Sequence, residues 1–218
     1  MTPTRDQSES AARFIPQGED LAALREAANS CRGCSLYRHA TQAVFGEGRR
    51  GAEILFIGEQ PGDREDVTGK PFVGPAGKLL DKCLQEAGID RSKVYVTNAV
   101  KHFKWEPRGK IRLHKKPDLA EIAACRPWLE REIAAVGPKL IVCLGATAAQ
   151  EMLGNKFRLT RHRSEIFEQP NSPALTATIH PSAILRMPDA EARQQETAQF
   201  VSDLRAAAAY AARAHEPR

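Results

Sequence analysis

The sequence predicts an α/β fold: a three-layer αβα arrangement with a central four-stranded parallel sheet. Two observations lead to this prediction. Four apolar segments have the length of short strands, and helical patterns separate them along the chain. The segments are EILFIG at 53–58, VYVTNAV at 94–100, KLIVCLG at 139–145 and ALTATIH at 174–180. Strands that alternate with helices form parallel sheets covered on both faces, and such sheets bind ligands at the carboxyl ends of their strands.

Helical patterns precede, separate and follow these segments. They run from Glu19 to Asn29, from about Pro75 to Ala87, from about Pro117 to Ala135, from the third strand to about Leu153, and from about Asp189 to Arg213. Residues 1–18 mix polar residues, Gly and Pro without periodicity, and we expect a disordered tail there. Residues 19–213 are expected to form a single domain, since no change of composition divides them.

The composition indicates a globular, soluble protein. Apolar residues make up 42% of the 218 residues and charged residues 27%. No apolar stretch approaches the roughly 20 residues that span a bilayer. Arg5, Asp6 and Glu9 stand where a signal peptide would need an apolar core. We therefore expect a cytoplasmic monomer without membrane contact, in a reducing compartment where disulfides are rare.

Positive charge is concentrated in one segment. The chain has a net charge of +5, and residues 101–116 hold seven Lys or Arg residues against the single acid Glu106. Phe103 and Trp105 are interleaved with these cations. Such a segment can bind phosphates and stack on bases. From charge alone it can equally be a solvated loop.

Polar residues follow three of the predicted strands. A Gly- and Pro-rich stretch, GEQPGDRED at 58–66 and GKPFVG at 69–74, follows the first strand, and its backbone N–H groups can approach a planar ligand. Asn98, near the end of the second strand, can donate and accept hydrogen bonds together, as the edge of a nucleobase requires. His180 ends the fourth strand segment. Taken singly, such residues are more often turn or structural residues.

Taken together, the three segments resemble the iron-sulfur, family 4-like members of the uracil-DNA glycosylase superfamily. The resemblance covers about residues 25–210 and depends on GEQPGDREDVTGKPFVGPAGKLLD, VTNAVK and HPSAILR. It implies that Phe72 stacks on an extruded uracil, that Asn98 recognises its amide edge, and that His180 stabilises negative charge on the departing base. The further implied site residues are catalytic Glu59 and substrate-binding Gly58, Gln60 and Asp63.

The five cysteines make metal binding the first explanation to examine. Cys31 and Cys34 form a C-x2-C pair ahead of the first strand. The resemblance implies a [4Fe-4S] cluster bound by Cys31, Cys34, His102 and Cys125, in which His102 departs from the all-cysteine pattern of the family. Imidazole replaces thiolate at Rieske centres, so this ligand set is chemically reasonable. A zinc site with the same four ligands is the alternative from spacing, and the other two cysteines are expected in the core.

The segment GKIRLHKKP at 109–117 lies between the last two implied ligands. It resembles the basic, histidine-bearing loop, of the KRRIH type, that marks the UdgX branch, and it departs from that pattern at Ile111, Leu113 and Lys116. The resemblance implies that neutral His114 attacks C1′ of the deoxyribose while Glu59 orients its ring. An N-alkylated imidazole is a poor leaving group, so the protein would remain on the DNA after one turnover.

The implied partner is uracil-containing DNA, with single strands accepted. The residues implied to bind its phosphates are Lys110, Arg112, Lys115 and Arg186. Two other functions stay open. One is a multiple-turnover uracil-DNA glycosylase in which His114 only positions water or phosphate. The other is a noncatalytic iron-sulfur protein that binds DNA or senses redox state.

Overall fold

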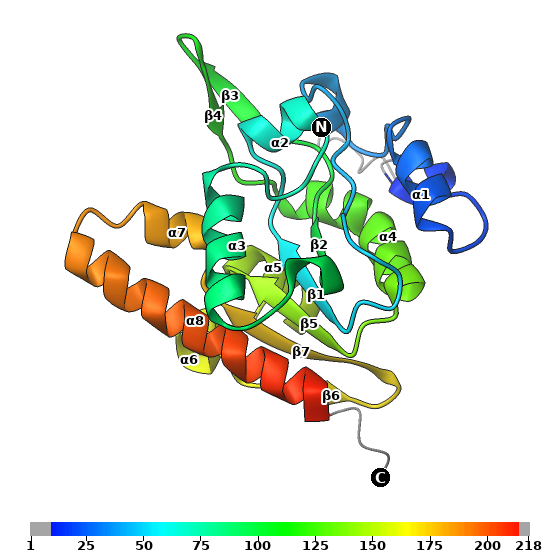
Figure 1. The fold of residues 1–218 in the computed structure, drawn as a ribbon. Coiled ribbons are helices and arrows are strands. Elements are labelled where there is room, and N and C mark those ends of the chain that lie inside the picture. The colour runs from blue at the N-terminus through cyan, green and yellow to red at the C-terminus, as the bar shows by residue number, and fades with distance from the viewer. Residues whose placement is uncertain (1–9, 214–218) are drawn as a thin grey trace.

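The fold is a mixed five-stranded sheet between two layers of helices (Figure 1). The computed structural model describes residues 10–213. The strand order is β2-β1-β5-β7-β6. The bounds are β1 Ile54–Gly58, β2 Tyr95–Asn98, β5 Leu140–Leu144, β6 Phe167–Gln169 and β7 Ser172–Thr178. Strands β2, β1, β5 and β7 run parallel to their neighbours in this group, which confirms the four predicted strands.

The fifth strand, β6, pairs antiparallel with β7 and was absent from the predicted sheet. It is three residues long and lies at the edge of the sheet. Phe167 is half-buried, whereas Glu168 and Gln169 are exposed. A strand this short and polar has no apolar run in the sequence, so the predicted four-stranded sheet lacked it.

Five of the helices match the helical patterns of the sequence. They are α1 Leu21–Ala28, α3 Pro75–Glu86, α4 Leu119–Val136, α5 Ala146–Leu153 and α8 Ala190–Arg213. Helix α4 begins with a capping box between Asp118 and Glu121 and ends at Gly137, which has a φ of 63°. None of the described helices is long and apolar enough to cross a membrane.

The parallel strands are apolar throughout because helices cover both faces of the sheet. On β1, Ile54 and Phe56 pack with residues of α3 and α8 on one face. Leu55 and Ile57 pack with residues of α4 and α5 on the other face. In Figure 1, α3 and α8 lie in front of the sheet and α5 lies behind it.

The remaining helices are too short for their periodicity to be recognised in the sequence. They are α2 Asp63–Thr68, α6 Leu159–His162, α7 Pro181–Leu185 and the 3-10 helices η1 Ala11–Phe14, η2 Ser35–Arg38 and η3 Arg91–Lys93. Helices α2 and α7 directly follow the ends of β1 and β7, so they help to build the site described below.

The basic segment is a β-hairpin rather than a loop. Strands β3 (Trp105–Arg108) and β4 (Ile111–His114) pair antiparallel, and Gly109 occupies the turn with a φ of 61°. The hairpin projects from the sheet-and-helix body at the top of Figure 1. Because directly opposed residues share a face, His114 and Trp105 lie on one face of the hairpin.

Part of the predicted disordered tail is ordered. Residues 1–9 lie outside the described residues, but Ala11–Phe14 form η1, and Ala11 is buried. Gly33 explains the close packing, since a Cβ at this position would lie 2.6 Å from the backbone nitrogen of Ala11. The chain between Cys31 and Cys34 therefore accommodates the backbone of residues 10–11, a contact that polarity and periodicity do not reveal.

Candidate active site

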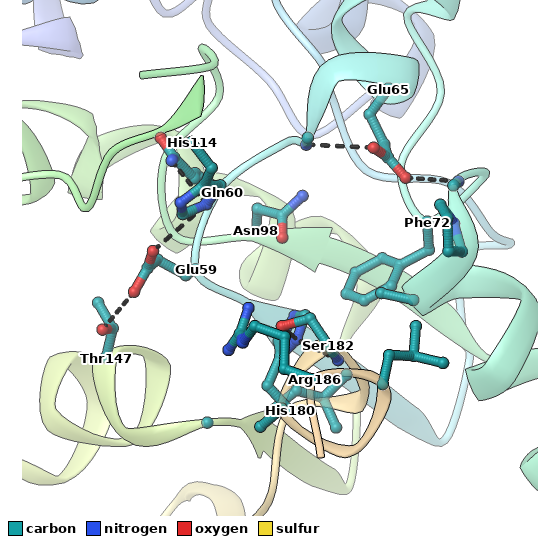
Figure 2. Close-up of a pocket in the computed structure, with 18 of the residues that line it drawn as sticks. Glu59, Gln60, Glu65, Phe72, Asn98, His114, Thr147, His180, Ser182 and Arg186 are labelled. Carbon is teal, nitrogen blue, oxygen red and sulfur yellow. Dashed lines mark hydrogen bonds and ion pairs between the residues drawn. The ribbon is translucent and has the colours of Figure 1, made fainter. Parts of the chain in front are cut away.

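A cavity of about 720 Å³ opens at the carboxyl ends of the parallel strands (Figure 2). Side chains from separate parts of the chain line it, and most of the residues predicted for the site are among them. The predicted residues that line the cavity are Glu59, Gln60, Asp63, Phe72, Asn98, His114, His180 and Arg186. The sheet topology brings them together because the segments that follow β1, β2 and β7 meet at one edge.

Gly58 lets two of these side chains approach the end of β1. A Cβ at Gly58 would clash with the amide oxygen of Asn98 and lie 2.8 Å from Cζ of Phe72. Asn98 and Phe72 are both buried, and Phe72 has a left-handed backbone with a φ of 56°. Any side chain at Gly58 would displace the flat ring or the amide, so this glycine shapes the slot between them.

Glu65 holds the loop that carries Phe72. Its carboxylate accepts hydrogen bonds from the backbone N–H groups of Gly62, at 3.1 Å, and Gly74, at 2.7 Å. These two glycines flank the segment from α2 to α3, and the two bonds are drawn in Figure 2. Glu65 was not among the site residues predicted from the sequence. Its signal was an acid three residues after the N-cap Gly62, the capping-box position of a short helix.

His180 is a neutral hydrogen-bond donor in this site. It is the N-cap of α7, and its Nδ1 accepts the backbone N–H of Ser182 at 3.1 Å. Burial, with smaller contributions from Arg186 and His114, lowers the pKa of His180 to about 4. An imidazole whose Nδ1 accepts carries its proton on Nε2, so Nε2–H is the group that can donate to a ligand.

His114 ends β4 and lies at the side of the cavity opposite Phe72 (Figure 2). Its Nε2 accepts a hydrogen bond from the amide of Gln60 at 2.8 Å and lies 3.6 Å from Oε1 of Glu59. Burial lowers the pKa of His114, although Glu59 opposes the shift. His114 is therefore a neutral imidazole with its Nε2 lone pair turned toward Gln60 and Glu59.

Gln60 holds the base of the hairpin. Its Oε1 accepts the backbone N–H of Lys104 at 2.8 Å, and its amide also donates to the carbonyl of Lys115 at 2.9 Å. The resemblance implied that Gln60 binds substrate. In the structure its amide is hydrogen-bonded to Lys104 before the hairpin and to Lys115 after it. Gln60 therefore holds the segment that carries His114.

Two of the four predicted phosphate-binding residues are exposed to solvent where DNA phosphates could reach them. Lys110, at the hairpin turn, and Arg186, at the cavity, are exposed. Lys115 is exposed but pairs with Glu106 at 2.8 Å. Arg112 differs from the expectation, because its guanidinium binds Asp63 and Asp66, at 2.6 Å each.

Asp63, predicted to bind substrate, is thus a partner of Arg112, and both residues fix the hairpin on α2. The aromatic residues of this segment also differ from the stacking surface that charge and composition allowed. Phe103 is buried, and the indole N–H of Trp105 donates to the carbonyl of His39 at 2.8 Å. The guanidinium of Arg112 lies 5.6 Å from the centre of each ring.

Three of the implied cluster ligands are buried together. Cys31, Cys34 and Cys125 belong to one packed cluster, and burial, with a smaller contribution from the other two thiols, raises the pKa of Cys125. Trp128 donates its indole N–H to Sγ of Cys31 at 3.2 Å, and the backbone N–H of Lys101 donates to Sγ of Cys125 at 3.3 Å. Such N–H···S bonds stabilise thiolates that bind iron.

The fourth implied ligand, His102, is buried, and burial lowers its pKa to about 4, which keeps the imidazole neutral. Within residues 10–213, no three His, Cys, Asp or Glu side chains are arranged to hold a single metal ion. Cys83 and Cys143 are fully buried in the two core clusters that cover the sheet, as predicted.

Comparison with known proteins agrees with this arrangement. A family model described as the uracil DNA glycosylase superfamily matches residues 45–205. The chain belongs to the uracil-DNA glycosylase superfamily. The type-4 uracil-DNA glycosylase of Sulfurisphaera tokodaii is 35% identical over 85% of each chain. That of Thermotoga maritima is 37% identical over 81% of this chain and 88% of its own, and that of Archaeoglobus fulgidus is 36% identical over 80% and 88%.

The site of this member of the uracil-DNA glycosylase superfamily contains one further residue that was not predicted from the sequence. Oγ1 of Thr147 donates to Oε2 of Glu59 at 2.5 Å (Figure 2). Thr147 and Glu59 lie 88 positions apart, on segments that follow different strands. No local sequence pattern links two such residues. Their contact could have been predicted only from the order of the strands in the sheet.

Proposed function

We propose that this protein excises uracil from DNA and remains covalently bonded to the abasic site through His114. The observation that carries the proposal is the position of His114: its Nε2 lies 3.6 Å from Glu59, at the cavity that also contains Phe72, Asn98 and His180. A base-binding slot and a neutral nucleophile share one cavity, so bond cleavage and capture of the sugar can follow each other without rearrangement of the fold.

The slot supplies recognition and departure of the base. Phe72 gives a flat apolar face on which an extruded uracil stacks, and the amide of Asn98 offers the donor and acceptor that match its edge. When the bond from C1′ to the base breaks, its electron pair goes to uracil. The neutral Nε2–H of His180 donates a hydrogen bond to the resulting anion, and this bond strengthens as negative charge develops on the base.

The hairpin supplies the nucleophile. As positive charge develops on the sugar, the carboxylate of Glu59 stabilises it, and the Nε2 lone pair of His114 forms the new bond to C1′. For this bond to form, the amide of Gln60 must release Nε2, to which it donates at 2.8 Å. Because the base is extruded and bound singly, we expect single-stranded DNA to be accepted.

A [4Fe-4S] cluster bound by Cys31, Cys34, Cys125 and His102 forms part of the proposal. The buried thiols, their N–H donors and the neutral imidazole suit such a group chemically. A single zinc ion would require sulfurs about 2.3 Å from one metal centre, a closer arrangement than that of a four-iron cluster. When bound, the cluster would crosslink the N-terminal segment to α4.

A multiple-turnover glycosylase that uses water is the second candidate. It is favoured by the relatives, which are named type-4 uracil-DNA glycosylases. In that case His114 would position water or phosphate and would form no bond. A noncatalytic iron-sulfur protein that binds DNA is a third function, and recovery of intact uracil DNA after incubation would identify it.

Replacement of His114 by Ser separates these functions. We expect His114→Ser to lose the denaturant-resistant complex with a uracil oligonucleotide but to release uracil repeatedly, since water can enter the vacated space. Turnover should be slow, because a misplaced nucleophile costs about 100-fold. Denaturing electrophoresis measures the complex, and a free-uracil assay measures release.

The matched control is His162→Ser, because His162 pairs with Glu165 and is outside the cavity lining. It should form the complex as the parent does, and a thymine oligonucleotide should form none with either protein. A denaturant-resistant complex of undiminished yield with His114→Ser would refute covalent capture by this histidine. Uracil released by the parent protein in excess of enzyme would favour the water mechanism.

A further inference from the structure

The turn between β5 and α5 contacts both sides of the proposed reaction centre. Gly145 ends this turn with a φ of 90°, and its backbone N–H donates to the carbonyl of Thr178 at 2.8 Å. A Cβ at Gly145 would lie 3.1 Å from Cβ of His180. Two residues later, Thr147 donates to Glu59. One short segment therefore contacts both His180, which is proposed to donate to the departing base, and Glu59, which is proposed to face the sugar.

The hydroxyl of Thr147 engages only one oxygen of Glu59. A carboxylate accepts hydrogen bonds and a hydroxyl has one proton to donate, so Oγ1 of Thr147 is the donor to Oε2 at 2.5 Å. The other oxygen, Oε1, is the one that lies 3.6 Å from Nε2 of His114. Thr147 is buried, whereas Glu59 is partly exposed, so the fixed end of the bond is the threonine.

Without this bond the carboxylate would have other positions to occupy. Glu59 has three side-chain torsions, and its carboxylate lies near the first turn of α5, where backbone N–H groups lack helical partners. A glutamate released from Thr147 can turn toward these N–H groups or toward solvent. Either movement takes Oε1 away from His114 and from the space in which C1′ would lie.

We propose that Thr147 is a positioning residue that holds Glu59 with Oε1 directed at His114 and the sugar. This inference rests on the proposed role of Glu59. The hydroxyl donates its one proton to the carboxylate, so it acts through Glu59. Its loss should therefore slow the chemical step and leave the affinity for DNA unchanged, because the stacking ring and the base-binding amide are untouched.

The test compares Thr147→Val, which keeps the side-chain shape, with Thr147→Ser, which keeps the hydroxyl. Under single-turnover conditions, we expect Thr147→Val to lower the maximal rate of complex formation about 10- to 100-fold at an unchanged half-saturating DNA concentration. Thr147→Ser should stay within about threefold of the parent rate. Thr147→Ala gives a second variant without the hydroxyl, in case valine disturbs the turn.

The control is Thr197→Val on α8, whose hydroxyl donates to the carbonyl of Arg193 at 2.7 Å. It should leave the rate unchanged. Melting temperatures of all variants identify any loss of fold. If Thr147→Val equals the parent, or if Thr147→Ser is as slow as Thr147→Val, the positioning role is wrong.

Failure of the proposed function is recognised separately. If the parent forms no covalent complex but releases uracil, the same variants are compared by uracil release. A rate lost in Thr147→Val and restored in Thr147→Ser would then still support positioning of Glu59, whereas equal rates in both assays would overturn it.

Discussion

At the scale of single residues, burial lowers the pKa of the two histidines that line the cavity. His114 and His180 face the same cavity, and burial is the largest cause of the lowered pKa of both. Glu59 acts in the opposite direction on His114, and the shift is nevertheless downward. In the proposed function, these two imidazoles are a neutral donor for the base and a neutral nucleophile for the sugar, although a carboxylate lies close to one of them.

The lowered pKa of His114 predicts the pH dependence of capture. An ordinary histidine, with a pKa of 6.5, is half protonated at that pH, and protonation removes the lone pair. Because the pKa of His114 is lower, the neutral fraction stays above one half at pH 6.5. We expect the single-turnover rate of complex formation to fall as the solution becomes more acid and to reach half its maximum only below pH 6.5.

This profile is measured by quenching the reaction in denaturant at each pH, with the circular dichroism spectrum of the protein recorded as a control for unfolding. A rate that halves at pH 6.5 or above would contradict the lowered pKa of His114. Glu59 raises the pKa of His114, so a profile shifted to still lower pH in Glu59→Gln would identify the histidine as the titrating group.

At the scale of elements, the β3–β4 hairpin is one part of the fold that the sequence did not predict. Its strands are four residues each, one of them contains Pro107, and most residues of both are exposed. Contacts with distant segments hold it: Arg112 with Asp63 and Asp66, and Gln60 with the chain at the hairpin base. These partners lie about 50 positions away along the chain, where no periodicity in the sequence can reveal them.

Arg112→Gln should detach the hairpin from α2. Asp66 would keep its hydrogen bonds from the backbone and hydroxyl of Thr41, at 2.9 and 2.6 Å, so the variant should fold. With the hairpin less firmly held, we expect complex formation to slow by about 10- to 100-fold through misplacement of His114. Amide hydrogen exchange within β3 and β4 should become faster. Bond cleavage should be affected less, so a larger share of the cleaved DNA should escape capture.

Glu106→Gln is the control, because it removes the exposed ion pair with Lys115, which joins the two sides of the hairpin rather than the hairpin and α2. It should leave both the hydrogen exchange and the captured share close to those of the parent. Unchanged exchange and an unchanged captured share in Arg112→Gln would mean that its ion pairs with Asp63 and Asp66 do not position His114.

At the scale of the whole molecule, the predictable part of the fold is the part whose burial is uniform. The four parallel strands are apolar on both faces, and the five matching helices have regular apolar positions, so both were recognised. Convergence of Phe72, Asn98 and His180 followed from the topology, since each lies at or beyond the carboxyl end of a strand of the parallel sheet. Glu65 and Thr147 were missed because their partners are set by packing between segments.

The cysteine cluster is connected to the base-binding slot through Lys101. Its backbone N–H donates to Cys125, and its buried ammonium donates to the carbonyl of Asn98 at 2.7 Å and pairs with the buried Glu132. Glu132 also accepts the hydroxyl of Thr97 at 2.8 Å. These contacts join α4, the end of β2 and the implied ligands into one buried polar network.

Removal of the proposed cluster should therefore destabilise the N-terminal segment from η1 to η2 more than the sheet. The parent protein, purified without oxygen, should be brown and contain about four iron and four sulfide per chain. Cys31→Ala, Cys34→Ala and Cys125→Ala should lose the colour, and His102→Ala should weaken it. Cys83→Ala, in the core between the sheet and α3, is the control and should keep the iron.

In the iron-free variants, the segment from η1 to η2 loses its crosslink to α4 and is held by the packing of apolar side chains such as Leu24 and Leu36. We expect its amide hydrogens to exchange faster, while those of β1 and β5, covered on both faces, stay protected. Lys101 still binds Asn98 when Cys125 is replaced. The affinity for uracil-containing DNA should therefore be largely kept while residues 10–45 lose their protection. Stoichiometric zinc without iron would refute the cluster, and equal loss of protection in the sheet would show that the cysteines support the whole fold.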